Sequence, residues 1–170
     1  MKSDNPKTPP GSGGKSDSVA TNVILLVEDS PDDAFLFLDL VRANRIRNLI
    51  MEVHDGDEAI EYLKGEGKFV DRQTYPMPSI LFLDLRMPKV NGFEVLRWIK
   101  TQAHLKDLLI VILTHHQEVK NVNEAYTLGA HSFLTKPLSP KELTNLITHF
   151  KPFFHSGHHS SPGNAGGGKA

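Results

Sequence analysis

The stretch ILFLDLRMPKVNGFEVL, residues 80–96, contains the signals that decide the fold. It begins with four consecutive apolar residues, Ile80–Leu83, which predict a short strand that is buried on both faces. Asp84 follows the strand, and Phe93 and Leu96 then recur at the spacing of one helix face. A buried strand, a polar turn and an amphipathic helix make up the repeating unit of a parallel sheet covered by helices.

The same unit recurs on both sides of this stretch. Short apolar runs predict strands at 23–27, 49–53, 80–83, 110–113 and 132–134. Helical patterns alternate with them at 31–44, 56–64, 92–102, 118–128 and 140–150. Strands and helices that alternate in this way predict an α/β fold, with helices on both faces of one parallel sheet.

Serine and proline mark the starts of two of these helices. Ser30 precedes Pro31 and has Asp33 three residues after it, which is typical of a helix N-terminus. Ser139 precedes Pro140 and has Glu142 at the corresponding place, which predicts a full capping box.

Length and composition restrict the classes of protein. The chain has 170 residues, a net charge of −1 and no cysteine, which excludes disulfides, a thiolate nucleophile and cysteine-ligated metals. We expect a disordered leader over 1–21, one domain over 22–154 and a flexible tail over 155–170. The near-neutral charge predicts no contact with nucleic acid or a membrane, and the short apolar runs predict no membrane-spanning segment. Because no signal peptide is recognisable, we expect a cytoplasmic location.

Polar residues follow four of the predicted strands. Glu28 and Asp29 come after the first strand, Asp84 after the third, Thr114 after the fourth and Lys136 after the fifth. Taken singly, each is most simply a solvated loop residue. Ligands of such sheets nevertheless bind at the carboxyl ends of the strands, where these residues would meet.

Carboxylates that converge in a small space repel one another and call for a cation. Mg²⁺ suits oxygen ligands and keeps positions open for a phosphate oxygen. Lys136 would neutralise a second phosphoryl oxygen and the hydroxyl of Thr114 would bind a third. The pattern predicts in-line transfer of a phosphoryl group onto a carboxylate.

Four segments resemble the receiver domain of bacterial response regulators. They are ILLVEDSPDD (24–33), residues 80–96, VILTHH (111–116) and GAHSFLTKPLSPKEL (129–143). The resemblance covers essentially the whole predicted domain. It implies a flavodoxin-like, doubly wound, five-stranded parallel sheet of order 2-1-3-4-5, with two helices on one face and three on the other.

The resemblance also implies roles for the acidic residues. Asp84 would be the phosphoacceptor and a ligand of Mg²⁺. Asp29 would bind the cation directly and Glu28 through water, and the backbone carbonyl of Arg86 would be a further ligand.

Switch and modulator positions follow from the same resemblance. Thr114 and Phe133 would be the switch residues, and the Lys136–Pro137 bond would be a cis peptide. Arg86, His115 and His116 would be modulators: the side chains of Arg86 and His116 flank the path of attacking water and would affect the lifetime of the phosphate, and His115 would restrict small phosphodonors. His115 has two equal interpretations: it crowds the acceptor, or it points to solvent.

The expected function is that of a stand-alone response regulator. A sensor histidine kinase would dock near helix 31–44, and the segment 65–79 resembles regulators paired with phytochrome kinases. Homodimers would form through the face of 118–128, 132–134 and 140–150, or through Phe153 and Phe154, which we expect to be exposed.

Several other interpretations remain open. An adaptor that never carries phosphate is one alternative. An aspartyl-phosphate phosphatase is another, although Arg86 stands where its second acid is needed. His155, His158 and His159 could bind a metal, but incidental solvated histidines are favoured.

Overall fold

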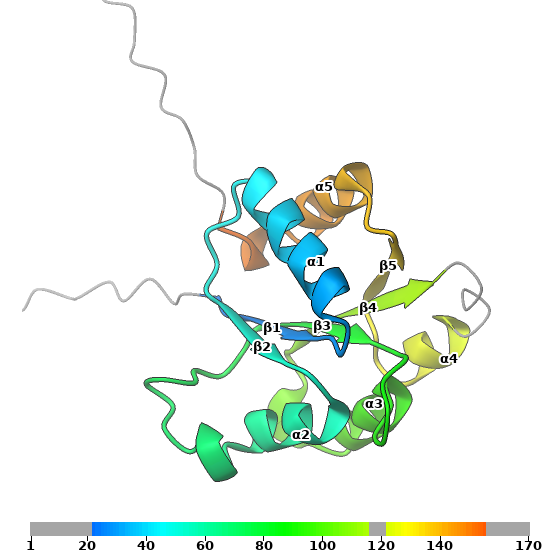
Figure 1. Cartoon of the computed structure of the whole chain (residues 1–170). Helices are drawn as coiled ribbons and strands as arrows, with labels where there is room; N and C mark the ends of the chain where they lie inside the picture. The colour runs from blue at the N-terminus through cyan, green and yellow to red at the C-terminus, as the bar shows by residue number, and fades with distance from the viewer. Residues whose placement is uncertain (1–21, 116–121, 156–170) are drawn as a thin grey trace, which may run out of the picture.

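The computed structural model describes residues 22–115 and 122–155. Its centre is a sheet of five parallel strands in the order β2-β1-β3-β4-β5, which confirms the predicted topology (Figure 1). The strands are β1 (Ile24–Val27), β2 (Ile50–Val53), β3 (Ile80–Asp84), β4 (Leu109–His115) and β5 (Ser132–Lys136). The helices are α1 (Pro31–Ala43), α2 (Gly56–Lys64), α3 (Gly92–Lys100), α4 (Val122–Thr127) and α5 (Pro140–His149). Short 3-10 turns lie at Gly67–Phe69, Ala103–Leu105 and Lys151–Phe153.

Helices cover both faces of the sheet. Buried residues of α1 and α5, such as Phe37 and Leu143, pack with Ile24 and Phe82 in one hydrophobic cluster. Buried residues of α2, α3 and α4 pack against the opposite face of the sheet in a second cluster. The division into two and three helices agrees with the sequence-based expectation (Figure 1). The continuous apolar runs of β1, β3 and β4 follow from this arrangement, because these three inner strands are covered on both sides.

The predicted start of α1 is confirmed, but that of α5 is only partly right. The Ser30 hydroxyl accepts a hydrogen bond from the Asp33 backbone N–H at 3.3 Å. Ser139 does precede α5, but its side chain makes no capping hydrogen bond, so the predicted capping box there is wrong. The capping box forms instead at α3, between Asn91 and Glu94.

The segment between α2 and β3 is packed against the domain. Arg72 donates to the carbonyls of Tyr62 and Leu63 in the last turn of α2, at 2.8 and 3.0 Å. Phe69 is buried; its ring lies tilted against Tyr62 and edge to face with Tyr75. The connection is therefore an ordered element of the domain.

The last described residues correct two expectations. Phe154 is only 6% exposed and packs into the cluster of α1 and α5, so it does not form an exposed aromatic pair with Phe153, which is half-buried. His155 is hydrogen-bonded rather than incidentally solvated: its ring Nε2 accepts from the Asn22 N–H at 3.2 Å and its N–H donates to Asn48 at 2.8 Å. The first residue of the predicted tail, His155, is therefore bonded to the domain, and the domain bounds stay a prediction. The predicted leader, His116, His158 and His159 lie outside the described residues.

None of the helices in the described parts of the chain is long and apolar enough to cross a membrane.

Candidate functional site

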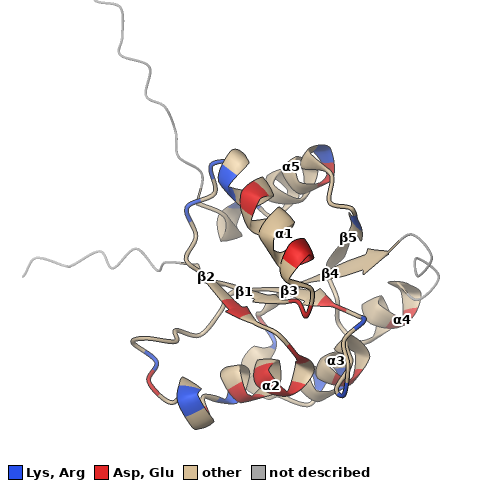
Figure 2. Cartoon of the chain, in the orientation of Figure 1, with Lys and Arg blue, Asp and Glu red and all other residues tan. Residues whose placement is uncertain are grey.

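Three acidic residues converge at the carboxyl ends of β1 and β3. Glu28 and Asp84 are buried, with 1% and 2% of their surfaces exposed, whereas Asp29 is exposed. One carboxylate oxygen from each of the three lies within 4.8 Å of the other two. Figure 2 shows acidic residues where the first turn of α1 meets these strand ends. We call Glu28, Asp29 and Asp84 the acidic cluster.

Backbone amides fix the two buried carboxylates. The Arg86 N–H donates to Asp84 Oδ1 at 2.8 Å, and the Ser30 N–H donates to Glu28 Oε1 at 3.2 Å. Both contacts close a turn directly after a strand, so the register of β1 and β3 determines where the carboxylates point. Ile24 to Val27 of β1 lie in register with Ile80 to Leu83 of β3, which brings the next residues, Glu28 and Asp84, side by side.

Lys136, at the end of β5, reaches this cluster from the far edge of the sheet. Its Nζ lies 2.6 Å from Asp84 Oδ2, 2.5 Å from Glu28 Oε2 and 3.0 Å from Asp33 Oδ2. The ammonium is 4% exposed, so its charge is compensated by carboxylates in place of water. The peptide bond from Lys136 to Pro137 is cis, as the resemblance implies.

Asp33 was missed as a site residue by the sequence analysis. We interpreted it only as a first-turn acid of α1, which it is. Because that helix begins directly after the acidic pair, its third residue, Asp33, lies beside the same strand ends. Its contact with Lys136 depends on how α1 packs against the sheet, so the sequence held no direct signal for it.

Burial and charge shift the pKa values of the central pair. Desolvation raises the pKa of Glu28 to about 7, with a further rise from the nearby Asp84, although Lys136 opposes both. Burial alone would lower the pKa of Lys136, but its hydrogen bonds to Asp84 and Glu28 outweigh burial and raise it. Lys136 is therefore always charged at physiological pH. For Glu28, the raised pKa means that the ionised form is disfavoured in the folded protein.

The acidic cluster fits a hard divalent cation. Lys136 contacts two of its three carboxylates, Glu28 and Asp84, which leaves an excess of negative charge, and oxygen atoms are the ligands that Mg²⁺ prefers. The exposed Asp29 opens the cluster to solvent, which suits a cation that keeps several waters. The backbone carbonyl of Arg86 as a further ligand stays a prediction.

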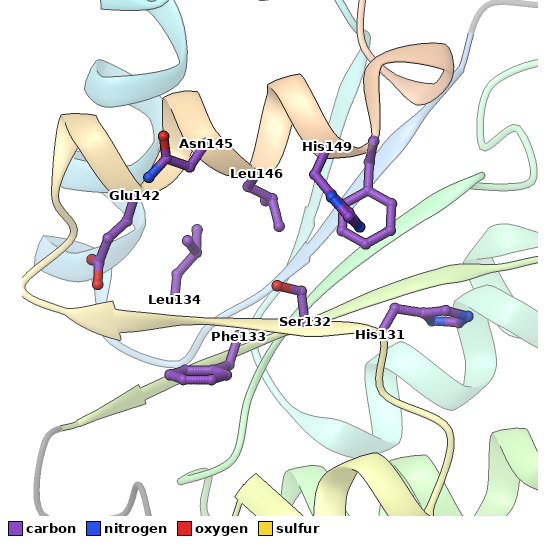
Figure 3. Close-up of a pocket in the computed structure, with 9 residues that line it drawn as sticks. His131, Ser132, Phe133, Leu134, Glu142, Asn145, Leu146 and His149 are labelled. Atoms are coloured by element: carbon purple, nitrogen blue, oxygen red, sulfur yellow. The ribbon is translucent and has the colours of Figure 1, made fainter.

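The switch positions lie on the neighbouring strands. Thr114 is fully buried in β4, in register with Thr135 of β5. Phe133 is half-buried and meets the exposed Tyr126 edge to face, with ring centroids 6.4 Å apart. Figure 3 shows Phe133 and Leu134 on opposite sides of β5. Their roles as switches stay predictions.

The modulator positions are partly described. Arg86 and His115 are exposed, and for His115 this favours the interpretation in which the ring faces solvent. His116 lies outside the described residues.

Comparison with known proteins gives one consistent family. Residues 24–148 match the response regulator receiver domain. The response regulator Rcp1 of Synechocystis sp. is 33% identical over 132 residues, which cover 78% of this chain and 88% of Rcp1. Among solved structures, the bacteriophytochrome response regulator RtBRR has a TM-score of 0.72 and 34% identity, with 84% of this chain and 85% of RtBRR covered. The Mn(2+)-bound form of Rcp1 has a TM-score of 0.64 and 32% identity, with 78% and 93% covered.

Proposed function

The chain belongs to the family of response regulator receiver domains, and from this premise we propose that Asp84 accepts a phosphoryl group from a sensor histidine kinase. The observation that carries the proposal is the meeting of the acidic cluster and Lys136 at one end of the sheet. The Lys136 ammonium and the Arg86 backbone N–H each donate to one oxygen of Asp84, which fixes the acceptor carboxyl group at the end of β3.

The transfer itself is a displacement at phosphorus. An oxygen of Asp84 forms a bond to the phosphorus of a phosphohistidine, and the bond from phosphorus to the imidazole nitrogen breaks. The electron pair of that bond stays on the nitrogen, and the other ring nitrogen of the phosphohistidine carries a proton, so neutral histidine leaves and an acyl phosphate remains. Lys136 then neutralises a phosphoryl oxygen, and the Thr114 hydroxyl donates to another. Mg²⁺, when bound by the acidic cluster, supplies further neutralisation of the phosphoryl charge.

Loss of the phosphoryl group is hydrolysis of this acyl phosphate. Water attacks phosphorus, the bond from phosphorus to the Asp84 oxygen breaks, and inorganic phosphate leaves. Arg86 stands two residues after Asp84, where a phosphatase of this chemistry needs an acid that can activate water. The site therefore favours a signalling protein that holds phosphate over a hydrolase that turns it over.

The partner that we propose is a phytochrome-type histidine kinase in the cytoplasm. Two relatives with solved structures are bacteriophytochrome response regulators, and the chain covers 85% and 98% of their lengths. Helix α1 offers a docking surface beside the site, because Phe35 and Leu36 are 64% and 52% exposed there. Output would pass through the face of α4, β5 and α5, where a cavity of about 390 Å³ lies between β5 and α5 (Figure 3). We propose that a homodimer also forms through this face. A homodimer through Phe154 is no longer proposed, because that side chain is buried.

Intact-mass measurement with acetyl phosphate and Mg²⁺ tests the proposal. We expect a mass gain of one phosphoryl group that is lost with Asp84→Asn and with removal of Mg²⁺ by a chelator. Asp39→Asn, which removes an exposed acid from α1, is the matched control and should keep the gain. No adduct from acetyl phosphate or from a phosphorylated kinase would favour the adaptor interpretation, and rapid continuous release of phosphate would favour the phosphatase.

A further inference from the structure

Asp33 lies at the site without a part in the chemistry proposed above. Its side chain is 32% exposed, and its Oδ2 accepts a hydrogen bond from Lys136 Nζ at 3.0 Å. It is not one of the three residues of the acidic cluster, whose oxygens lie within 4.8 Å of one another. Lys136 is thus held by two carboxylates inside the cluster, Glu28 and Asp84, and by one carboxylate outside it.

The distribution of charge indicates what the outer contact does. Glu28 and Asp84 are partners of Lys136 and are also candidate ligands of a divalent cation. A cation that binds them neutralises much of their charge, and their attraction for the ammonium falls accordingly. Asp33 lies outside the cluster, so a cation bound there leaves its contact with the ammonium in place.

We propose that Asp33 is a positioning residue that anchors the Lys136 ammonium beside Asp84 when the acidic cluster holds a cation. The inference rests on the proposed function, since the position of the ammonium matters for activity only if Asp84 receives a phosphoryl group. A lysine side chain has many rotamers, and a fixed partner limits them at the moment of transfer. The same contact ties the first turn of α1 to the end of β5.

Asp33→Asn tests the anchor with little change of shape. It removes the charge, while the backbone N–H of residue 33 still donates to Ser30 and keeps the helix cap. Asp32→Asn is the matched control, because it removes the same charge from the same helical turn at an exposed position. Asp33→Glu should restore the contact, and Asp33→Ala is the second variant if Asp33→Asn does not fold.

The first measurement is the NMR signal of the Lys136 ammonium in protein labelled with ¹⁵N at lysine Nζ. A buried ammonium that is held by acceptors exchanges slowly with water, so its signal is visible. We expect the signal to persist on addition of Mg²⁺ in the natural protein and in Asp32→Asn, and to broaden or disappear in Asp33→Asn. The rate of phosphorylation by acetyl phosphate should fall roughly three- to tenfold in Asp33→Asn and by less than about twofold in Asp32→Asn.

Two outcomes separate this inference from the function on which it rests. Equal behaviour of Asp33→Asn and Asp32→Asn, in both the ammonium signal and the rate, would overturn the anchor while Asp84 remains the acceptor. If the natural protein gains no phosphoryl group at all, the proposed function fails, and the ammonium signal alone then decides whether Asp33 holds Lys136.

Discussion

Glu28 and Lys136 are charged residues that are almost fully buried and in direct contact with each other. Each would be costly alone, and the pair is tolerated because Asp84 and Asp33 also contact the ammonium. Burial still disfavours the charged form of Glu28, and the nearby Asp84 adds to this, which is why the pKa of Glu28 is raised. A site with this arrangement is suited to attract a cation, at the cost of stability when no cation is bound.

The pH dependence of stability should reveal this cost. Glu28 has a folded pKa of about 7 and an ordinary value of 4.5, so the folded state binds more protons between these values. Stability from this group is therefore fully present below about pH 4.5 and is lost as the pH rises through 7. In protein freed of metal, Glu28→Gln should abolish this loss and be more stable than the natural protein at pH 8, by up to about 3 kcal/mol.

Denaturant unfolding at a series of pH values, with a chelator present, measures this difference. Glu52→Gln serves as the control, because Glu52 is exposed and should leave the pH profile unchanged. Parallel profiles for Glu28→Gln and the natural protein would contradict the prediction. Added Mg²⁺ should stabilise the natural protein more than Glu28→Gln, if Glu28 contributes to the cation site.

Single residues show where sequence reasoning reaches its limit. Asp84 and Lys136 could be placed because each directly follows an apolar strand, and the ends of parallel strands meet. Asp33 could not be assigned in this way, because contact with Lys136 depends on how α1 packs against the sheet. Phe154 was misjudged for a related reason: the turn at Lys151–Phe153 folds the chain back onto the core.

At the scale of elements, the pattern of apolar residues predicted every described strand to within two residues at each end. The predicted strand 110–113 is extended to Leu109–His115, and 132–134 to Ser132–Lys136. These extensions include Thr114, Thr135 and Lys136, which are polar but buried where the two strands pair. A search for apolar runs cannot find polar residues that are buried because two strands pair.

The connection between α2 and β3 should depend on Arg72. Its guanidinium binds two carbonyls in the last turn of α2 and also the Tyr75 carbonyl, at 3.3 Å. Arg72→Ala should reduce the free energy of unfolding by roughly 1–3 kcal/mol, because it leaves these carbonyls without a charged donor. Arg72→Lys should recover little of this loss, because an ammonium lacks the planar fork.

Urea unfolding tests this prediction, with Arg97→Ala as the control. Arg97 pairs with Glu124 at 2.8 Å, but both side chains are more than half exposed, so its loss should change stability by less than about 1 kcal/mol. Equal effects of the two alanine variants would show that Arg72 does not hold the segment.

The start of α3 should be sensitive to any side chain at Gly92. A Cβ there would lie 2.4 Å from the Asp84 carbonyl oxygen and 2.7 Å from Leu85 Cα, and neither backbone atom can move alone. Gly92→Ala should therefore destabilise the domain by roughly 1–3 kcal/mol and displace the turn after the acceptor. We expect a slower gain of phosphoryl mass from acetyl phosphate at a temperature where the variant is folded.

Gly129→Ala is the control that separates the loss of stability from the slower phosphorylation. Gly129 has a φ of +105°, so alanine strains its backbone, but an added Cβ meets nothing within 4 Å. This variant should lose stability without a slower phosphoryl gain. A normal rate in Gly92→Ala would mean that the turn after Asp84 tolerates the displacement.

At the scale of the whole molecule, the two ends of the sheet carry different structures. The acidic cluster lies at the carboxyl ends of the strands. At the amino ends, Asn22, Asn48 and residues 152–155 form a hydrogen-bonded group that we call the terminal clasp. It joins the residues before β1, the residues before β2 and the chain after α5.

Asn48 is the centre of the terminal clasp. Replacing it should lower the stability of the domain without slowing the phosphorylation of Asp84. The Asn48 side-chain amide donates to the carbonyls of Asn22 and Phe153, at 2.7 and 2.9 Å, and accepts from the His155 N–H at 2.8 Å. Because Asn48 is 7% exposed, Asn48→Ala should cost roughly 2–4 kcal/mol of unfolding free energy. Asn145→Ala, at an exposed position on α5, should cost less than about 0.5 kcal/mol.

In Asn48→Ala, the rate at which Asp84 gains a phosphoryl group should stay within about twofold of the rate in the natural protein, when both are measured well below the melting temperature of the variant. The reason is that the terminal clasp and the acidic cluster lie at opposite ends of the strands. Denaturant unfolding and intact-mass kinetics on the same samples measure the two quantities together. A rate that falls in step with stability would contradict this separation and would mean that the clasp, through α1 and β1, also positions the site.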